Sequence, residues 1–139
     1  MSIINFECDY TEGAHPRILE RLIATNLEQT SGYGNDPYCA AAREKIKAAC
    51  GTPDADVHFL VGGTQTNTTV LSAILRPYQG AISADEGHIA VHETGAIEAT
   101  GHKVLTLPCA NGKITAAQID TCVEAHYTSG TSEHTVQPG

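Results

Sequence analysis

A glycine-rich stretch followed by hydroxyl and amide side chains is the first feature that could do chemistry. Residues 62–67 read Gly-Gly-Thr-Gln-Thr-Asn and stand between a β-branched run and a segment with helical apolar spacing. Free N–H groups at a helix start favour an anion, and glycine lets a phosphate approach the backbone. The stretch matches neither G-x-x-x-x-G-K-[ST] nor G-x-G-x-x-G. A phosphate site is therefore possible here, although a tight turn in which Thr64 or Thr66 caps the helix fits equally.

Two histidines with an adjacent carboxylate form a second constellation. His88 and His92 are four residues apart, with Glu93 next, and in a helix the two imidazoles would share a face. A metal pair would need a third ligand and usually shows the order H-E-x-x-H, whereas the order here is H-I-A-V-H-E. One imidazole lying flat on a planar cofactor is a second interpretation, and a histidine without a chemical role is a third. These residues alone leave all three open, and no metal site is predicted.

The cysteines show no pattern of a disulfide or metal framework. They are odd in number and widely scattered, so free and mostly buried thiols are expected. The five are Cys8, Cys39, Cys50, Cys109 and Cys122. Neither a G-x-S-x-G elbow nor a cysteine in a known nucleophile motif occurs. Hydrolase chemistry therefore has little support.

The elements that must position these residues begin with two expected helices. Apolar residues at three- and four-residue spacing predict a surface helix over residues 15–29. After a polar, glycine-rich linker, Asp36 and Pro37 form a start signal for a second helix that ends at Gly51.

From residue 57 onward, short β-branched runs alternate with helical patterns. The expected strands are 57–61, 81–83 and 103–107, and the expected helices are 65–75, 88–99 and 116–125, the last introduced by Thr115. Such alternation implies right-handed crossovers and an α/β fold with a mostly parallel sheet. Residues 127–139 lack apolar periodicity, so an irregular tail is expected where the alternation calls for another strand. The open edge of so small a sheet suggests an incomplete domain.

Composition bounds the class of protein. The 139 residues, 41% hydrophobic, suit one compact domain. A formal charge of -8 disfavours a nucleic-acid partner. The acidic opening is unlike a signal peptide, and no run of roughly 18 apolar residues occurs. A soluble, cytoplasmic protein with no membrane partner is expected.

Four motifs taken in order carry a resemblance to a known family. They are FECDYTEGAHP (6–16), GYGNDP (32–37), FLVGGTQTN (59–67) and DEGHIAVHETGAIEATGHKV (85–104). In this order they resemble the N-terminal portion of the threonine aldolase or β-eliminating lyase family of fold-type-I pyridoxal-phosphate enzymes. The resemblance implies part of an aspartate-aminotransferase-like large domain, its mostly parallel sheet flanked by helices. The expected organisation is an N-terminal segment (1–14), the partial large domain (15–126) and the tail (127–139).

The resemblance also implies roles for residues of the glycine turn and the histidine pair. Gly63, Thr64 and Gln65 would bind the phosphate of pyridoxal 5'-phosphate. His88 would stack on the pyridine ring beside the substrate and act in catalysis, and Glu93 is a weaker candidate. Asn67 is expected to start the helix behind the turn.

Further family positions lie near the N-terminus. Cys8 and Asp9 stand where the family has a Ser-Asp pair that helps to bind substrate, and Tyr33 lies in a turn that borders a neighbouring subunit's active site. Cys8 departs from the family pattern. A thiol is a poorer hydrogen-bond partner for a carboxylate than a hydroxyl, which weakens the substrate site expected from the resemblance.

Three groups that the family needs have no counterpart in the motifs of this sequence: the aspartate at the pyridine nitrogen, the carboxylate-binding arginine and the Schiff-base lysine. None of its lysines lies in a matching motif. We therefore expect a fragment of a lyase that cleaves L-threonine-like β-hydroxy amino acids to glycine and an aldehyde, inactive by itself. Its expected partners are further copies of itself or the missing C-terminal half. β-Elimination, transamination, or a non-catalytic binding or assembly role are the alternatives.

Overall fold

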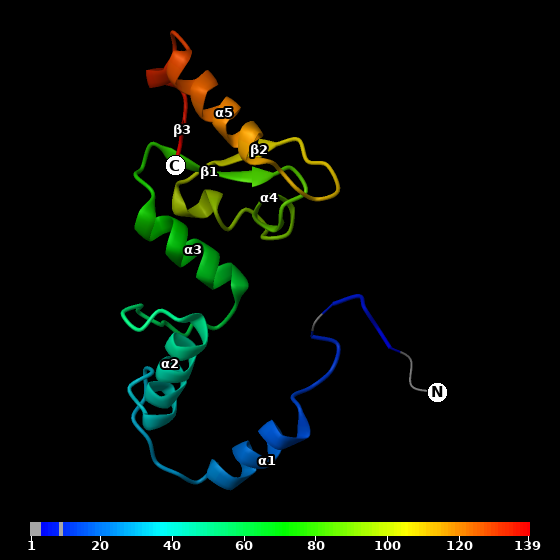
Figure 1. Cartoon of the computed structure of the whole chain (residues 1–139), viewed down its shortest axis with the longest axis vertical. Coiled ribbons are helices and arrows are strands. Elements are labelled where there is room, and N and C mark those ends of the chain that lie inside the picture. Colours follow the sequence, from blue (N-terminus) through cyan, green and yellow to red (C-terminus); the bar gives the residue numbers. More distant parts are fainter. Residues whose placement is uncertain (1–3, 9) are drawn as a thin grey trace. The chain divides into compact units, whose positions relative to one another are not determined.

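The structure is a computed structural model that describes residues 4–8 and 10–139. The chain divides into two compact units, Met1–His58 and Phe59–Gly139, and each is described by itself. Figure 1 shows the helices and strands along the chain. Among the described residues, no helix is long and apolar enough to cross a membrane.

The first unit contains helix α1, Pro16–Thr25, which is shorter than the helix expected over residues 15–29. His15 caps its start, because the imidazole Nδ1 accepts a hydrogen bond from the Arg17 amide over 3.2 Å. A surface helix ordinarily buries its apolar stripe against a core, but the large apolar side chains of α1 are exposed; they are Ile18, Leu19, Leu22 and Ile23.

Helix α2, Pro37–Cys50, has both of the ends that its sequence predicts. The Asp36 carboxylate accepts a hydrogen bond from the Cys39 amide over 2.8 Å, and hydrogen bonding to Cys39 holds the pKa of Asp36 below its ordinary value. Gly51 ends the helix in the left-handed region at φ 65°, where glycine has no steric penalty.

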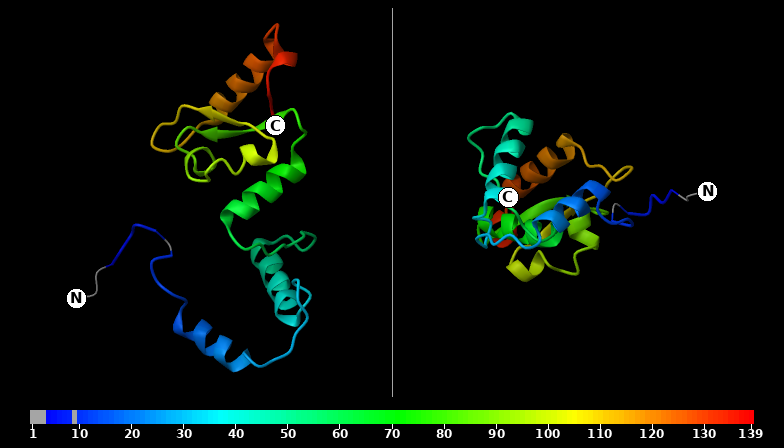
Figure 2. Two further views of the ribbon diagram at one scale, coloured as in Figure 1. Left: turned by 180° about the vertical axis from the view of Figure 1, so that it is seen from behind. Right: turned by 90° about the horizontal axis from the view of Figure 1, so that it is seen from below.

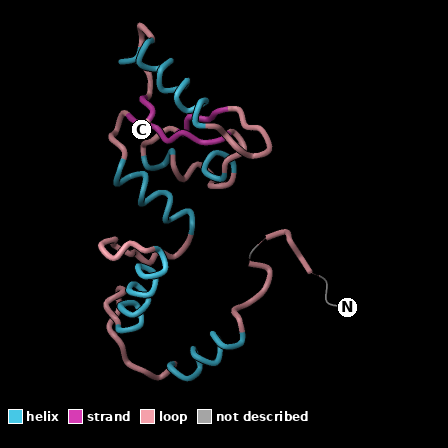
Figure 3. The backbone as a smooth tube through the Cα atoms, in the orientation of Figure 1, coloured by secondary structure: helices cyan, strands magenta, loops and turns pink. Residues whose placement is uncertain are grey.

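The second unit is built on a parallel sheet with the strand order β2-β1-β3. The strands are β1 (Gln79–Ala84), β2 (Val104–Leu107) and β3 (Gln137–Pro138), drawn in magenta in Figure 3. Ala81 pairs with Val104, and Gln79 pairs with Gln137. This arrangement confirms the α/β class and the parallel sheet.

Helical segments lie on both faces of this sheet. The connection from β1 to β2 contains α4 (His88–Val91) and a 3₁₀ turn, η1 (Glu98–Thr100), and the connection from β2 to β3 contains α5 (Ala116–Thr128). Because β2 and β3 lie on opposite sides of β1, right-handed crossovers place the two connections on opposite faces. Figures 1 and 2 show α5 on one side and α4 on the other. Buried apolar side chains around the strands include Ala81, Ile97 and Val104.

Two expected elements differ in the structure. Residues 57–61 form no strand, and the three-stranded sheet does not include them. β-Branched side chains favour a strand only where a neighbouring strand completes the ladder. The helix expected over 88–99 stops after one turn, because Thr94 at φ 53° and Gly95 at φ 73° are left-handed.

The C-terminal stretch is more regular than the irregular tail expected over 127–139. Residues 127 and 128 extend α5, a 3₁₀ turn (η2) spans Ser132–His134, and β3 follows. The Gln137 amide donates to the Tyr78 carbonyl over 3.0 Å. The alternation of strands and helices therefore predicted the structure of this stretch better than its lack of apolar periodicity did.

The start of α5 and the cysteines bear on two further expectations. Thr115 and Gln118 form a reciprocal capping box, which confirms the predicted start. All five cysteines are free, as expected, but none is fully buried and Cys50 is exposed.

Candidate functional site

The glycine turn forms the open start of helix α3, Gly63–Ile74. Gly62 is the extended N-cap residue, and no side chain caps the helix. The first helical bond runs from the Thr66 amide to the Gly62 carbonyl over 3.0 Å. The amides of residues 63–65 therefore have no acceptor in the described part of the chain. A Cβ added at Gly62 or Gly63 would meet no atom within 4 Å beyond the neighbouring backbone, so the space on that side of the turn is open.

The two threonines do not cap α3, which corrects the tight-turn alternative. Both lie inside the helix, and the Thr66 hydroxyl donates to the Gly62 carbonyl over 2.9 Å instead of accepting from an amide. The described residues offer no partner to the Thr64 hydroxyl. This hydroxyl and the open amides are together suited to an anion.

The Gln65 side chain makes a hydrogen bond within the turn. Its side-chain oxygen Oε1 accepts a hydrogen bond from the Val61 amide over 2.8 Å. The side chain therefore closes the turn that leads into α3, and what Gln65 can offer an anion is its backbone amide.

His88 follows the C-terminal end of β1 and begins α4. The connection that leaves β1 and the one that leaves β2 turn to opposite faces of the sheet, which makes the carboxyl ends of these two strands a topological switch point. Ligands of open parallel sheets collect at such points. The His88 side chain is 65% exposed there, so its ring is accessible.

Glu93 connects His88 to α3. Its carboxylate Oε1 lies 2.9 Å from His88 Nδ1 and accepts a hydrogen bond from Asn67 Nδ2 over 2.5 Å. The Glu93 side chain is fully buried, and its other oxygen, Oε2, has no partner among the described residues. Asn67 does not start α3 as expected but lies one turn inside it, on the same face as Gly63. This network therefore brings the glycine turn and His88 to one site.

His92 is the C-cap residue of α4, and its ring centroid lies 5.7 Å from that of His88 at an interplanar angle of 52°. Within residues 4–8 and 10–139, the His, Cys, Asp and Glu side chains form no group of three or more that could hold a metal ion. The partner of His88 in this structure is a carboxylate.

The proposed substrate-binding residues belong to the first unit. Cys8 is half-buried, and Tyr33 is fully exposed with a left-handed backbone at φ 61°. Asp9 lies outside the described residues. The structure leaves the roles of these three residues as predictions.

The loops after β1 and β2 are tied together by Asp85 and Cys109. The Cys109 amide donates to Asp85 Oδ1 over 3.0 Å, and the thiol lies 3.4 Å from Glu86 Oε2. Hydrogen bonding to Asp85, followed by burial, raises the pKa of the Cys109 thiol. The same contact with Cys109 lowers the pKa of Asp85. The thiol is therefore held in its unreactive form beside the C-terminal ends of the strands.

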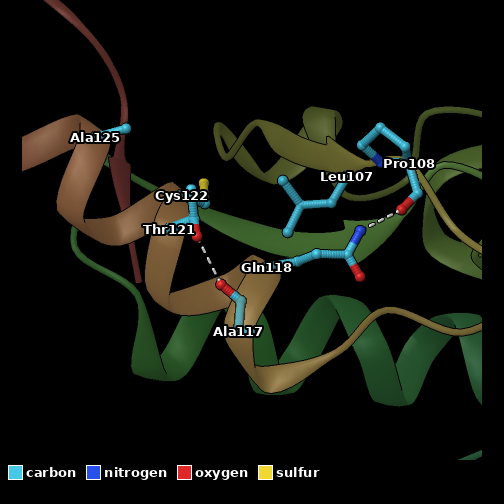
Figure 4. A pocket seen from close by; sticks show the side chains of 7 residues that line it. All are labelled: Leu107, Pro108, Ala117, Gln118, Thr121, Cys122 and Ala125. Carbon is cyan, nitrogen blue, oxygen red and sulfur yellow. Dashed lines mark hydrogen bonds between the residues drawn. The ribbon is translucent and has the colours of Figure 1, made fainter.

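A cavity of about 480 Å³ lies between the end of β2 and α5, away from the glycine turn and His88 in sequence. Figure 4 shows its lining residues, which are Leu107, Pro108, Ala117, Gln118, Thr121, Cys122 and Ala125. The Gln118 side-chain nitrogen Nε2 donates to the Pro108 carbonyl over 2.7 Å, and the Thr121 hydroxyl donates to the Ala117 carbonyl over 2.8 Å. With no charged side chain in its lining, this cavity is a poorer phosphate site than the start of α3.

Comparisons with known proteins agree with this geometry. Residues 5–133 match the family described as Beta-eliminating lyase. The chain is 30% identical over 116 residues to the low specificity L-threonine aldolase of a Pseudomonas species, and 29% identical to that of Pseudomonas aeruginosa. Each match covers 82% of this chain and 33% of the relative.

A solved structure described as Leishmania major threonine aldolase superposes with a TM-score of 0.87 at 49% identity. That match covers 94% of this chain and 37% of the other. The chain thus spans about a third of the length of the proteins that it matches.

Enzymes of this family use pyridoxal 5'-phosphate. The residues at the site fit this group, because three open amides and the Thr64 hydroxyl suit its phosphate while the exposed His88 ring suits its pyridine. On the match over residues 5–133, the chain belongs to the β-eliminating lyase family of pyridoxal-phosphate enzymes.

Proposed function

We propose that the chain is the N-terminal part of a lyase that cleaves L-threonine-like β-hydroxy amino acids to glycine and an aldehyde. The observation that carries the proposal is the junction of the α3 start with His88 through Asn67 and Glu93. This junction joins an anion site to an exposed imidazole. The relatives described as L-threonine aldolases support the choice of substrate class.

In this proposal, the start of α3 binds the cofactor phosphate. The amides of residues 63–65 and the Thr64 hydroxyl donate to its oxygens, and hydrogen bonds to a charged acceptor are stronger than those to a neutral one. The α3 dipole adds to the attraction for the anion. When bound, pyridoxal 5'-phosphate supplies the electron sink for breaking a carbon–carbon bond.

His88 has two tasks in the same proposal. Its ring would hold the pyridine of the cofactor by stacking, and its Nε2 would accept the proton of the substrate β-hydroxyl, directly or through a water molecule. A neutral imidazole suits general-base catalysis near neutral pH. This second task makes His88 the proposed catalytic residue of the chain.

Three residues of the first unit have proposed roles in the assembled enzyme. Cys8 and Asp9 bind substrate, and Tyr33 borders the active site of a neighbouring subunit. The exposed apolar side chains of α1 are consistent with assembly into a homo-oligomer or with binding of a C-terminal half. Covering such an apolar stripe is favourable, because it removes apolar surface from water. We also propose that the assembled enzyme acts in the cytoplasm.

A chimera tests the proposed function. This chain replaces the matching N-terminal part of Leishmania major threonine aldolase, to which it is 49% identical, and glycine and aldehyde released from L-threonine are measured. The parent enzyme and the parent with its N-terminal part deleted are the controls. We expect the chimera to cleave L-threonine and the deleted enzyme to be inactive.

The chimera also separates the alternatives. A folded, cofactor-loaded chimera that performs β-elimination or transamination without aldol cleavage would replace the proposed reaction. A folded chimera with no turnover would favour a binding or assembly piece. The absorbance of bound cofactor shows whether the chimera has taken up the cofactor.

A further inference from the structure

Glu93 is a buried carboxylate whose described hydrogen bonds all converge on one atom. Its side chain is fully buried, and Oε1 contacts both Asn67 Nδ2 and His88 Nδ1, whereas Oε2 has no described partner. A buried carboxylate is costly unless it is paired or hydrogen-bonded. The contacts through Oε1 compensate part of that cost.

The geometry at Oε1 determines the proton on His88. The amide nitrogen of Asn67 can only donate, so Oε1 accepts from it. An ionised carboxylate can only accept, so His88 Nδ1 carries the hydrogen of its 2.9 Å contact with Oε1. In the neutral ring the other nitrogen, Nε2, then holds a free lone pair. The described residues offer Nε2 no partner.

The backbone around Glu93 fixes this carboxylate in place. The Ala96 amide donates to the Glu93 carbonyl over 2.9 Å, in the turn where Thr94 and Gly95 have left-handed backbones. Ile97, which follows in this turn, is fully buried. His88, in contrast, lies at the start of a helix of one turn with an exposed ring. The rigid partner is therefore Glu93, and it orients the less constrained histidine.

We propose that Glu93 is a positioning residue that holds His88 in the Nδ1–H tautomer and leaves Nε2 as the free base. Asn67 supports it by holding Oε1 from the α3 side. The catalytic meaning of this tautomer rests on the proposed function, but the tautomer itself does not. In the other tautomer Nε2 would carry the hydrogen, whereas the reaction needs a lone pair on that nitrogen.

The test reads the tautomer by NMR on the full chain with ¹⁵N-labelled histidine and no cofactor. The ring nitrogen shifts distinguish Nδ1–H from Nε2–H at about pH 9, above the range in which imidazoles ordinarily titrate. His102 is an internal reference, because its Nδ1 lies 3.1 Å from the Gln79 carbonyl, which can only accept. His92, whose ring nitrogens have no hydrogen bond among the described residues, is the comparison for a free ring.

We expect His88 and His102 to show the Nδ1–H pattern and His92 to show the Nε2–H form that free imidazoles favour. Glu93→Gln keeps an oxygen acceptor and should keep the Nδ1–H form of His88. Glu93→Met has similar size and no acceptor, and should move His88 to mostly Nε2–H while His102 stays unchanged. Unchanged His102 signals also show that the variant is folded.

Two results would overturn the proposal: a wild-type His88 that is mainly Nε2–H, or a folded Glu93→Met variant in which Nδ1–H persists. The wild-type spectrum by itself shows which tautomer His88 adopts, so the test remains decisive even if the Glu93→Met variant does not fold. In the chimera, Glu93→Met should lower kcat while changing KM much less. Glu93→Gln should restore kcat. If the tautomer is as proposed but the chimera cleaves no β-hydroxy amino acid, the proposed function fails and the positioning role stands.

Discussion

Asn67 on α3 and His88 on α4 hydrogen-bond to the same atom, Oε1 of Glu93, over 2.5 and 2.9 Å. This shared acceptor fixes the open start of α3 relative to the exposed imidazole at the end of β1. A cofactor with a phosphate at one end and an aromatic ring at the other needs two such groups at a fixed separation.

Replacing His88 by asparagine should separate cofactor binding from catalysis. In the chimera, we expect His88→Asn to reduce L-threonine cleavage by roughly 100-fold or more, because a general base contributes about that much to the rate. Cofactor affinity should change far less, since stacking adds only about 0.5–1.5 kcal/mol. His92→Asn is the matched control and should have little effect. Equal activity in the two variants would leave His88 with a stacking role alone.

Thr64→Val should weaken binding of the phosphate ester by about 1–3 kcal/mol, through loss of a charge-assisted hydrogen bond. Thr68→Val is the control on the same helix, because the Thr68 hydroxyl bonds to the helix carbonyls of Thr64 and Gln65. Calorimetric titration of each cofactor-free chimera with the phosphate ester compares the binding free energies of the two variants. Similar losses in both variants would mean that the Thr64 hydroxyl does not touch the phosphate.

Cys109 should be alkylated slowly. Hydrogen bonding to Asp85 and burial raise the pKa of the thiol, so at a given pH a smaller fraction is the reactive thiolate. Asp85→Asn removes the charge but keeps an oxygen acceptor for the Cys109 amide, and should lower that pKa and speed alkylation several-fold. Iodoacetamide labelling followed by peptide mass spectrometry measures the rate, with the exposed Cys50 as reference. An unchanged rate would exclude this control by Asp85.

Gly87→Ala should destabilise the unit that contains His88. An ideal Cβ at Gly87 would lie 2.9 Å from the Ala84 carbonyl oxygen and would clash with the Ser83 hydroxyl. Such crowding typically costs about 1–3 kcal/mol. Gly130 has no atom within 4 Å of the same position, so Gly130→Ala is the control. Urea unfolding measures both, and equal midpoints would show that the β1–α4 turn relaxes without cost.

Local signals in the sequence predicted elements whose ends are made by nearby residues. Asp36, Gly51 and Thr115 each set a helix boundary through contacts within a few residues. Residues 57–61 were wrongly predicted as a strand because strand pairing depends on distant residues. The pairing of β3 with β1 was missed for the same reason.

The candidate site divides in the same way. The glycine turn and His88 could be predicted, because each lies at a junction that its own neighbours define. The contact of Asn67 with Glu93 could not, since the two are 26 residues apart. The resemblance made Glu93 only a weaker candidate, and its complete burial depends on the packing of the segment after α4.

The place where a phosphorylated cofactor analogue binds on this chain tests the proposed cofactor site directly. Deoxypyridoxine 5'-phosphate has no aldehyde and cannot label lysines, and its binding can be followed by amide and histidine NMR shifts. We predict saturable shifts at the amides of residues 63–65 and at the His88 ring, and much smaller shifts with unphosphorylated deoxypyridoxine. Shifts centred on the cavity between β2 and α5, or equal shifts with and without the phosphate, would contradict the claim that α3 and His88 form the cofactor site.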